Sequence, residues 1–257
     1  MQDLTIYNKC NEKLSAYLFD PPTNGKYMLV ICHGFRGAKE NGGKTFAFAE
    51  KLQKLEMGVL AFDFRGSGQS EGDFASITLS RQADDLQQII DYVHTQYSLP
   101  IILLGRSFGG STILAGGSGD PRIAGYILWS TPVLMQQTFS AILPNEYRLM
   151  EQGNTVKIKD ESGEYVLQPE LVTDFYQHNM DAYLRNIGIR PTLIIHARDD
   201  EAVDPSNALY MQERLPNSCL HIVDNAGHRF LDKIAEREGI TIDWLMKTFE
   251  LSLRGCF

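Results

Sequence analysis

Short apolar runs alternate with stretches of helical periodicity along most of this chain. Residues 4–7 and 14–19 alternate between apolar and polar positions, which predicts an antiparallel pair of strands. Later runs are continuously apolar, as is typical of strands covered on both faces of a sheet. These runs are residues 28–32, 59–62, 101–104, 123–129, 191–195 and 219–223. The pattern therefore predicts eight strands, six of them buried on both faces.

Segments with apolar residues at helical spacing lie between these runs, for example the segment containing Leu86, Ile89 and Val93. The predicted helices cover residues 45–55, 86–93, 107–115, 206–214 and 230–251. Alternating strands and helices after an antiparallel start are typical of a mostly parallel sheet with helices on both faces. We therefore expect an α/β fold around an eight-stranded sheet.

Residues 131–184 break this alternation. Residues 134–150 are helical or irregular in pattern, and residues 169–179 predict a short helix. Between them, residues 155–167 alternate around Glu161-Ser162-Gly163, which predicts a hairpin. Because the segment lies between two predicted strands, we expect it to cover the end of the sheet. The chain is accordingly expected to form a single domain, residues 1–257, with a cap insertion at about 132–185.

One apolar run leads directly into Gly105-Arg106-Ser107-Phe108-Gly109, and a predicted helix follows. Gly-x-Ser-x-Gly between a strand and a helix is the arrangement of a nucleophile elbow. The sharp turn requires small neighbours around a strained serine and raises the serine hydroxyl above the sheet edge. A glycine-rich turn with an incidental serine is the alternative interpretation. The context favours Ser107 as a nucleophile.

A serine nucleophile needs a base, and a carboxylate best orients that base. His228 lies in the segment after the last predicted strand, so it can reach the sheet edge that carries Ser107. The acid is expected after residues 191–195, where we favour Asp200 over its neighbour Asp199. Asp204 is expected instead to cap the helix that starts near residue 206.

A tetrahedral intermediate also needs two backbone N–H donors. The N–H of Phe108 lies at the start of the helix that follows the serine. The second donor is expected from Phe35, because Gly34 allows the backbone before it to approach a substrate oxygen. His33 is expected to support this segment through hydrogen bonds.

Composition narrows the choice of partners. The net charge of −8 argues against a nucleic-acid or anionic-membrane partner. The first residues show no secretory pattern and no apolar run approaches a membrane span, so we expect a cytoplasmic location. Four cysteines lack metal-site spacing and are expected to be reduced, with Cys32 and Cys219 buried in strands. No cofactor and no metal are expected, and self-association as a homodimer is left open.

The chain resembles α/β-hydrolases of the cinnamoyl (feruloyl) esterase branch over nearly its whole length. The resemblance rests on His33-Gly34-Phe35, the Gly105–Gly110 motif, and residues 63–72, 196–203 and 226–230. It implies a serine esterase with Asp200 as the acid and a cap that holds an aromatic acyl group. Two positions depart from the family pattern: Ala197 follows the strand-end histidine, and Asp204 stands where many members have proline. The cap region is the least family-like part of the chain.

Residues 63–72 contain charged side chains among glycines, and we expect Asp63 and Arg65 to pair with each other structurally. A rival hypothesis starts from residues 38–45, which differ from a phosphate-binding P-loop at Ala38 and end in Lys44 and Thr45. Asp63 would then hold magnesium. The loop lies five residues beyond its strand, and this hypothesis of nucleotide hydrolysis leaves Ser107 and His228 without a role. A non-catalytic binding protein on the same fold is a third hypothesis.

The residues together favour a cytoplasmic serine carboxylesterase that forms an acyl-enzyme. The expected substrate is a small-molecule ester with a small to medium acyl group, including aromatic groups of the cinnamoyl type. Peptide and thioester bonds remain alternatives, because the same three side chains can cleave them.

Overall fold

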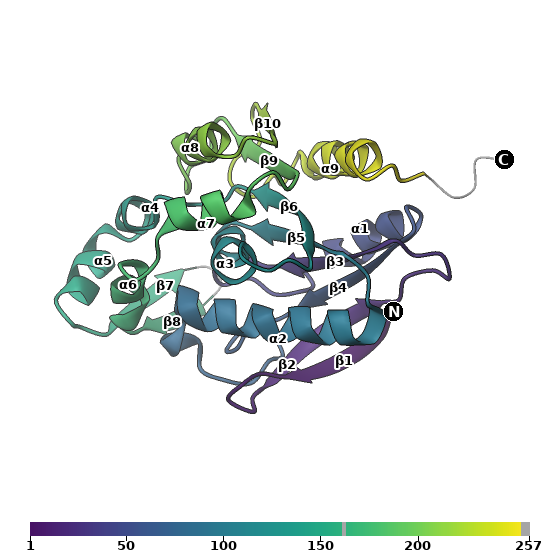
Figure 1. Ribbon diagram of the computed structural model, residues 1–257. Helices are drawn as coiled ribbons and strands as arrows, with labels where there is room; N and C mark the ends of the chain where they lie inside the picture. Colours follow the sequence, from purple (N-terminus) through teal and green to yellow (C-terminus); the bar gives the residue numbers. More distant parts are fainter. Residues whose placement is uncertain (161–162, 253–257) are drawn as a thin grey trace.

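An eight-stranded sheet forms the centre of the computed structural model, which describes residues 1–160 and 163–252 (Figure 1). The order of the strands is β1-β2-β4-β3-β5-β6-β9-β10. In chain order the strands are β1 (Gln2–Tyr7), β2 (Lys13–Phe19), β3 (Tyr27–Cys32), β4 (Met57–Phe62), β5 (Ile101–Arg106), β6 (Ile123–Trp129), β9 (Thr192–Ala197) and β10 (Ser218–Val223). β1 and β2 pair antiparallel, β2 joins β4 antiparallel, and the remaining neighbours are parallel. The predicted α/β fold is confirmed.

Helices cover both faces of this sheet, as predicted. Successive side chains of a strand point to opposite faces, so Leu103 contributes to one apolar core and Leu104 to the other. The first core also contains residues of α2 (Leu79–Tyr97), α3 (Phe108–Gly117) and α8 (Ser206–Arg214). The second contains residues of α1 (Lys44–Gln53) and α9 (Ile234–Thr248). A short 3-10 helix, η1 (Phe74–Ser76), precedes α2.

Two details at the end of the chain correct the sequence predictions. The last helix begins at Ile234, because Phe230 has a left-handed backbone with φ of 54° and a fully buried ring. A helix cannot continue through that conformation. Cys219 is exposed on β10, which is an edge strand of the sheet, whereas Cys32 on β3 is buried as predicted.

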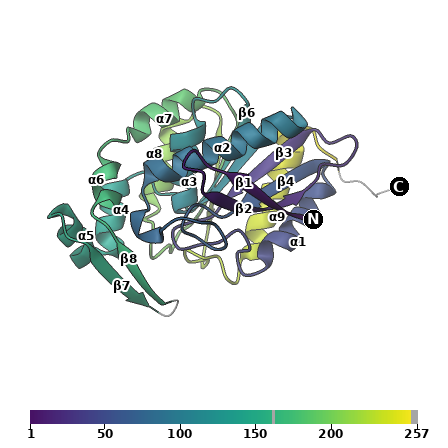
Figure 2. The same cartoon turned by 90° about the horizontal axis from the view of Figure 1, so that it is seen from below.

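The segment between β6 and β9, residues 130–191, is called the insertion here. Its elements are α4 (Met135–Ile142), α5 (Pro144–Glu151), β7 (Val156–Asp160), β8 (Gly163–Leu167), α6 (Glu170–Phe175) and α7 (Met180–Ile187). β7 and β8 pair antiparallel, which confirms the predicted hairpin, although Glu161 and Ser162 of its turn lie outside the described residues. Figures 1 and 2 both show α5, β7 and β8 at one side of the molecule, beside the sheet.

Hydrogen bonds attach the insertion to α2. The Asp174 carboxylate accepts the N–H of Ser80 at 2.9 Å and its hydroxyl at 2.6 Å. His178 Nε2 lies 3.1 Å from the same carboxylate. Burial opposes ionisation of the Asp174 carboxyl, but the hydrogen bonds from His178 and Ser80 outweigh this effect. The pKa of Asp174 therefore lies below its ordinary value. We call Ser80, Asp174 and His178 the insertion clasp.

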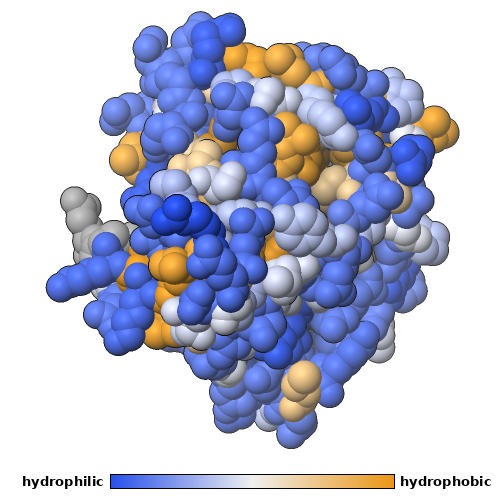
Figure 3. Space-filling view, turned by 90° about the vertical axis from the view of Figure 1, so that its left-hand side faces the viewer, coloured by the Kyte–Doolittle hydropathy of each residue, from blue (hydrophilic) through white to orange (hydrophobic). Residues whose placement is uncertain are grey.

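The surface of the insertion side is mostly hydrophilic, with separate hydrophobic patches (Figure 3). Four large apolar or aromatic side chains in the described part of the insertion are exposed: Ile142, Leu149, Tyr176 and Ile189. Among residues 1–160 and 163–252, no helix combines the length and the apolar character that crossing a bilayer requires.

The loop after β4 corrects a further prediction, because Asp63 and Arg65 do not pair with each other. Lys39 Nζ lies 2.7 Å from the buried Asp63 carboxylate. Arg65 Nε donates to Asp85 Oδ1 at 2.9 Å. The chain turns through Gly66 and Gly68 at positive φ, so each buried charge meets a partner from a different segment.

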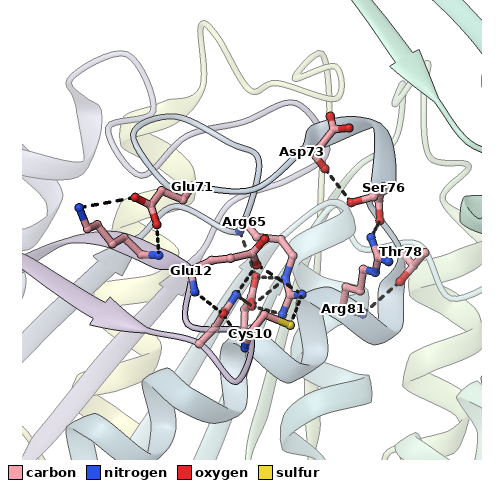
Figure 4. A network of polar contacts seen from close by, with 11 residues as sticks. Cys10, Glu12, Arg65, Glu71, Asp73, Ser76, Thr78 and Arg81 are labelled. Carbon is pink, nitrogen blue, oxygen red and sulfur yellow. Dashed lines mark hydrogen bonds and ion pairs between the residues drawn. The ribbon is translucent and has the colours of Figure 1, made fainter.

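The guanidinium of Arg65 also reaches the turn between β1 and β2, where it approaches the sulfur of Cys10 and the carboxylate of Glu12 (Figure 4). Arg65 therefore ties the loop after β4 to both α2 and β1–β2. A buried charge destabilises the fold when it lacks a partner, and these contacts supply the partners of the Arg65 guanidinium.

Candidate active site

The backbone at Ser107 forms the sharp turn that the motif predicted. Ser107 has φ of 52° and ψ of −126° between the end of β5 and the start of α3. A Cβ on Gly105 would lie 2.5 Å from the Gly109 carbonyl oxygen, and one on Gly109 would lie 2.4 Å from the carbonyl oxygens of Cys32 and His33. Real Cβ atoms do not approach oxygen so closely, so the turn can form only with glycine at both positions.

His228 lies within hydrogen-bonding distance of Ser107. Its Nε2 is 3.1 Å from Ser107 Oγ, and its Nδ1 is 2.9 Å from Asp200 Oδ2. The loop that carries His228 is held by its neighbours after β9, since the N–H of His228 donates to Glu201 at 2.9 Å. Ser107, Asp200 and His228, which come from three distant parts of the sequence, thus form one chain of hydrogen bonds.

Asp200 is fixed from several directions. The N–H groups of Ala202 and Val203 donate to its Oδ1 at 3.0 and 2.8 Å. Burial opposes ionisation of this carboxyl, but the hydrogen bonds from His228 and Val203 outweigh it and lower its pKa. Asp199 accepts the N–H of Ala226 instead, at 3.0 Å. The structure therefore brings Asp200 to His228, and Asp199 to the backbone of the same loop.

A second histidine, His196, lies beside Asp200 in a fully buried position. Its Nε2 donates to the Val203 carbonyl at 2.8 Å and is 3.4 Å from Asp200 Oδ2. Burial lowers the pKa of His196, so its imidazole is neutral at neutral pH. No role for this histidine is predicted from the sequence pattern. The structure places it as a support for the turn that presents Asp200.

The segment from His33 to Phe35 passes close to Ser107. A Cβ on Gly34 would lie 3.1 Å from the Ser107 Cβ, so the absence of a side chain permits this approach. His33 Nδ1 donates to the Gly34 carbonyl at 2.8 Å, and its Nε2 accepts the N–H of Phe64 at 3.1 Å. These two contacts agree with the expected supporting role of His33.

Two cavities of about 470 and 410 Å³ are both lined by Ser107. Both volumes lie in the range of small-molecule sites. The larger cavity is walled by apolar residues from the sheet loops and from the insertion. They are Phe35, Phe108, Phe139, Ile142, Leu143 and Ile158. His228 lines both cavities.

The smaller cavity is polar, and sequence reasoning missed its lining. Its charged residues are Arg36, Glu40, Lys44, Arg106, Arg229 and Arg237. Arg106 occupies the variable position directly before Ser107 in the motif, which is a usable signal for a residue beside the nucleophile. Arg237 lies within α9, where its helical position gave no indication of this cavity.

The rival nucleotide site is not assembled. Both Asp63 oxygens are taken, since Oδ1 accepts the N–H of Lys39 and Oδ2 accepts from Lys39 Nζ and the N–H of Gln69. This carboxylate, with its side chain 1% exposed, has no oxygen left to bind magnesium. In the part of the chain that the structure describes, no cluster of three or more His, Cys, Asp or Glu residues could hold a metal ion.

Comparisons with known proteins agree with this architecture. A family model described as serine aminopeptidase S33, a hydrolase family, matches residues 23–183. Monoglyceride lipase of Rattus norvegicus is 33% identical over 137 residues, which cover 52% of this chain and 44% of that protein. The quorum-quenching protein AidA of Acinetobacter baumannii is 32% identical over 45% of this chain and 39% of its own length. The matched part of this chain thus spans less than half of either relative.

Among solved structures, Est1E of Butyrivibrio proteoclasticus with bound ferulic acid superposes with a TM-score of 0.79. The superposition covers 96% of this chain and 99% of that structure at 20% sequence identity. At this identity the likeness establishes a shared fold.

Proposed function

The chain belongs to the serine aminopeptidase S33 family of α/β-hydrolases, and from that premise we propose that it is a serine carboxylesterase. The observation that carries the proposal is the chain of hydrogen bonds from Ser107 through His228 to Asp200, at 3.1 and 2.9 Å. The name of a similar protein, a monoglyceride lipase, supports an ester as the substrate bond.

Ser107 Oγ attacks the ester carbonyl while His228 Nε2 takes its proton. Asp200 accepts from His228 Nδ1, which fixes the tautomer and stabilises the imidazolium as it forms. Collapse of the tetrahedral intermediate releases the alcohol, which receives the proton from His228 and leaves an acyl group on Ser107. A water molecule then repeats the sequence and releases the acid.

The backbone N–H groups of Phe35 and Phe108 hold the oxyanion in this proposal. Phe108 is the first residue of α3, so its N–H is not used within the helix and the helix dipole favours negative charge there. The close approach of Gly34 to Ser107 supports Phe35 as the second donor.

The apolar cavity suits a medium or aromatic group of the ester. The rings of Phe35, Phe108 and Phe139 pack against one another there, with centroids 5.5 to 6.2 Å apart. Because α4 and β7 supply part of this wall, we propose that the insertion acts as a cap on a single-domain hydrolase and selects the substrate.

The test is hydrolysis of a panel of p-nitrophenyl esters that differ in the acyl group, run with wild type and Ser107→Ala. We expect kcat to fall by on the order of a millionfold in Ser107→Ala, because the nucleophile is removed. Ser140→Ala on α4 is the matched control and should retain wild-type rates. Equal rates for wild type and Ser107→Ala would refute the proposal. A matching p-nitroanilide and a thioester in the panel determine whether the amide or thioester bond is preferred.

A further inference from the structure

We propose that the substrate ester carries an anionic group, a carboxylate or a phosphate, which Arg106 and Arg237 bind in the polar cavity. An apolar group of the same substrate occupies the apolar cavity that Ser107 also lines. The inference rests on the proposed hydrolase function and adds the chemical class of the substrate.

Arg237 is buried, and among the described residues no carboxylate forms an ion pair with its guanidinium. Arg237 is 2% exposed, and its guanidinium carbon lies 4.0 Å from the centre of the Trp129 ring. The adjacent Glu238 pairs with Lys51 at 2.8 Å instead. In the described residues, Arg237 Nε has no hydrogen-bond partner. A buried cation is normally paired, so a guanidinium in this state lacks its counter-charge.

Arg106 is in a similar condition one residue before Ser107. One of its terminal nitrogens donates to Asn41 Oδ1 at 3.2 Å, a neutral acceptor. Its Nε is buried, and within residues 1–160 and 163–252 it finds no acceptor. Burial lowers the pKa of both arginines, and the two cations repel each other, so that the pKa of Arg237 falls to about 9. Both remain protonated at neutral pH.

Two carboxylates attract these cations from a distance, Asp200 for Arg106 and Glu238 for Arg237, but each is bonded to another group. Lys44 lines the same cavity, and Arg229 and Arg36 line both cavities, with Arg36 packed on the ring of Tyr165. Glu40 is the acid of this lining, and it accepts the Tyr17 hydroxyl at 2.9 Å. The chain as a whole carries a net charge of −8, so this gathering of cations runs against its overall charge. A bound anion would relieve their mutual repulsion.

The position of the cavity assigns that anion to the substrate. Gly34, Ser107 and His228 line the same space as Arg106 and Arg237. A carboxylate or phosphate bound there would lie beside the reacting ester group, and the planar guanidinium matches either anion through paired N–H donors. Charge-assisted hydrogen bonds of this kind favour the anionic substrate over a neutral one by about tenfold or more.

The experiment compares matched esters on the wild-type enzyme. Three phenyl hexanoates carry a para carboxylate, a para phosphate or a para carboxamide, and they place the anion in the alcohol. Two p-nitrophenyl esters, a hemiglutarate and its terminal amide, place it in the acyl group. Each kcat/KM is divided by the rate of that ester in alkali, which removes differences in intrinsic reactivity. We expect at least one anionic ester to exceed its carboxamide by about tenfold.

The variants Arg237→Met and Arg106→Gln are expected to reduce that ratio toward one, through KM more than kcat. Arg185→Met, which removes an exposed arginine of α7, is the matched control and should keep the ratio. Circular dichroism confirms that each variant is folded. The inference is overturned if no anionic ester is preferred, or if the preference persists in both site variants. Hydrolysis of neutral esters that depends on Ser107 would in that case still support the proposed function.

Discussion

Three consecutive acidic residues after β9 accept hydrogen bonds from three different groups of one loop. Asp199 accepts the N–H of Ala226, Asp200 accepts from the His228 ring, and Glu201 accepts the N–H of His228. The position of the His228 imidazole therefore depends on carboxylates that differ in their roles although they are adjacent in sequence.

Asp200→Asn is expected to lower kcat by about ten-thousandfold, because an amide cannot stabilise the imidazolium and favours the wrong tautomer. Asp199→Asn is the matched comparison, since it changes a neighbour whose partner is a backbone N–H. We expect it to retain kcat within about tenfold. Both are measured by steady-state hydrolysis of a p-nitrophenyl ester, and a larger loss in Asp199→Asn would show that the wrong aspartate was assigned.

Individual residues could be predicted where a motif fixes the local backbone. Ser107 follows from its glycines, and the position of His228 follows from the loop after the last strand. The pairing of Asp63 could not be predicted, because its partner Lys39 is distant in sequence and is brought near by the fold. That Arg237 has no ion-pair partner among the described residues could not be predicted either, because Glu238 pairs with the distant Lys51 and the guanidinium packs on the distant Trp129 ring.

At the scale of elements, the sharp turn from β5 to α3 depends on close packing of backbone against backbone. Gly109 of α3 contacts the carbonyls that end β3 and begin the Phe35 segment. The serine and the proposed oxyanion donor are thereby fixed relative to each other through a single glycine.

Gly109→Ala is expected to lower the free energy of unfolding by about 2–4 kcal/mol, because its Cβ would meet two carbonyl oxygens that cannot move independently. Gly119→Ala is the control, since a Cβ there meets nothing within 4 Å. Urea unfolding followed by circular dichroism measures both. A midpoint for Gly109→Ala equal to that of Gly119→Ala would contradict the packing argument.

The elements themselves were largely predictable, because apolar runs and helical spacing report burial directly. Errors occurred where burial depends on neighbours in space. Cys219 lies in an apolar run, but β10 has only one neighbouring strand and leaves it exposed. Phe230 is apolar at helical spacing, but its ring is buried by a turn of the chain ahead of α9.

For the whole molecule, stability in acid should depend on carboxylates that are ionised and paired in the folded state. Asp120, Asp174 and Asp200 all have a pKa below the ordinary value, because hydrogen bonds to their charged forms outweigh burial. A lowered pKa in the folded state gives stability that is present above the unfolded value, and it is lost as the pH falls through the folded value.

The free energy of unfolding is therefore expected to be steady near neutral pH and to fall steeply below about pH 4. Asp174→Asn, in the insertion clasp, should lower it by about 1–2 kcal/mol at pH 7 and make the decline in acid shallower. Asp243→Asn, at an exposed position of α9, is the control. Urea titrations from pH 7 to about 3 measure the slopes, and parallel curves for wild type and Asp174→Asn would exclude the clasp as a contributor.

The insertion leaves and re-enters the sheet on adjacent strands, since β6 pairs in parallel with β9 from Tyr126 opposite Thr192 to Trp129 opposite Ile195. Closing a loop between neighbouring strands costs little more when the loop is long than when it is short. The insertion could consequently be exchanged between homologous proteins as one unit. Such an exchange would replace part of the wall of the apolar cavity while the hydroxyl, the imidazole, Arg106 and Arg237 stayed in place, because they lie outside the insertion.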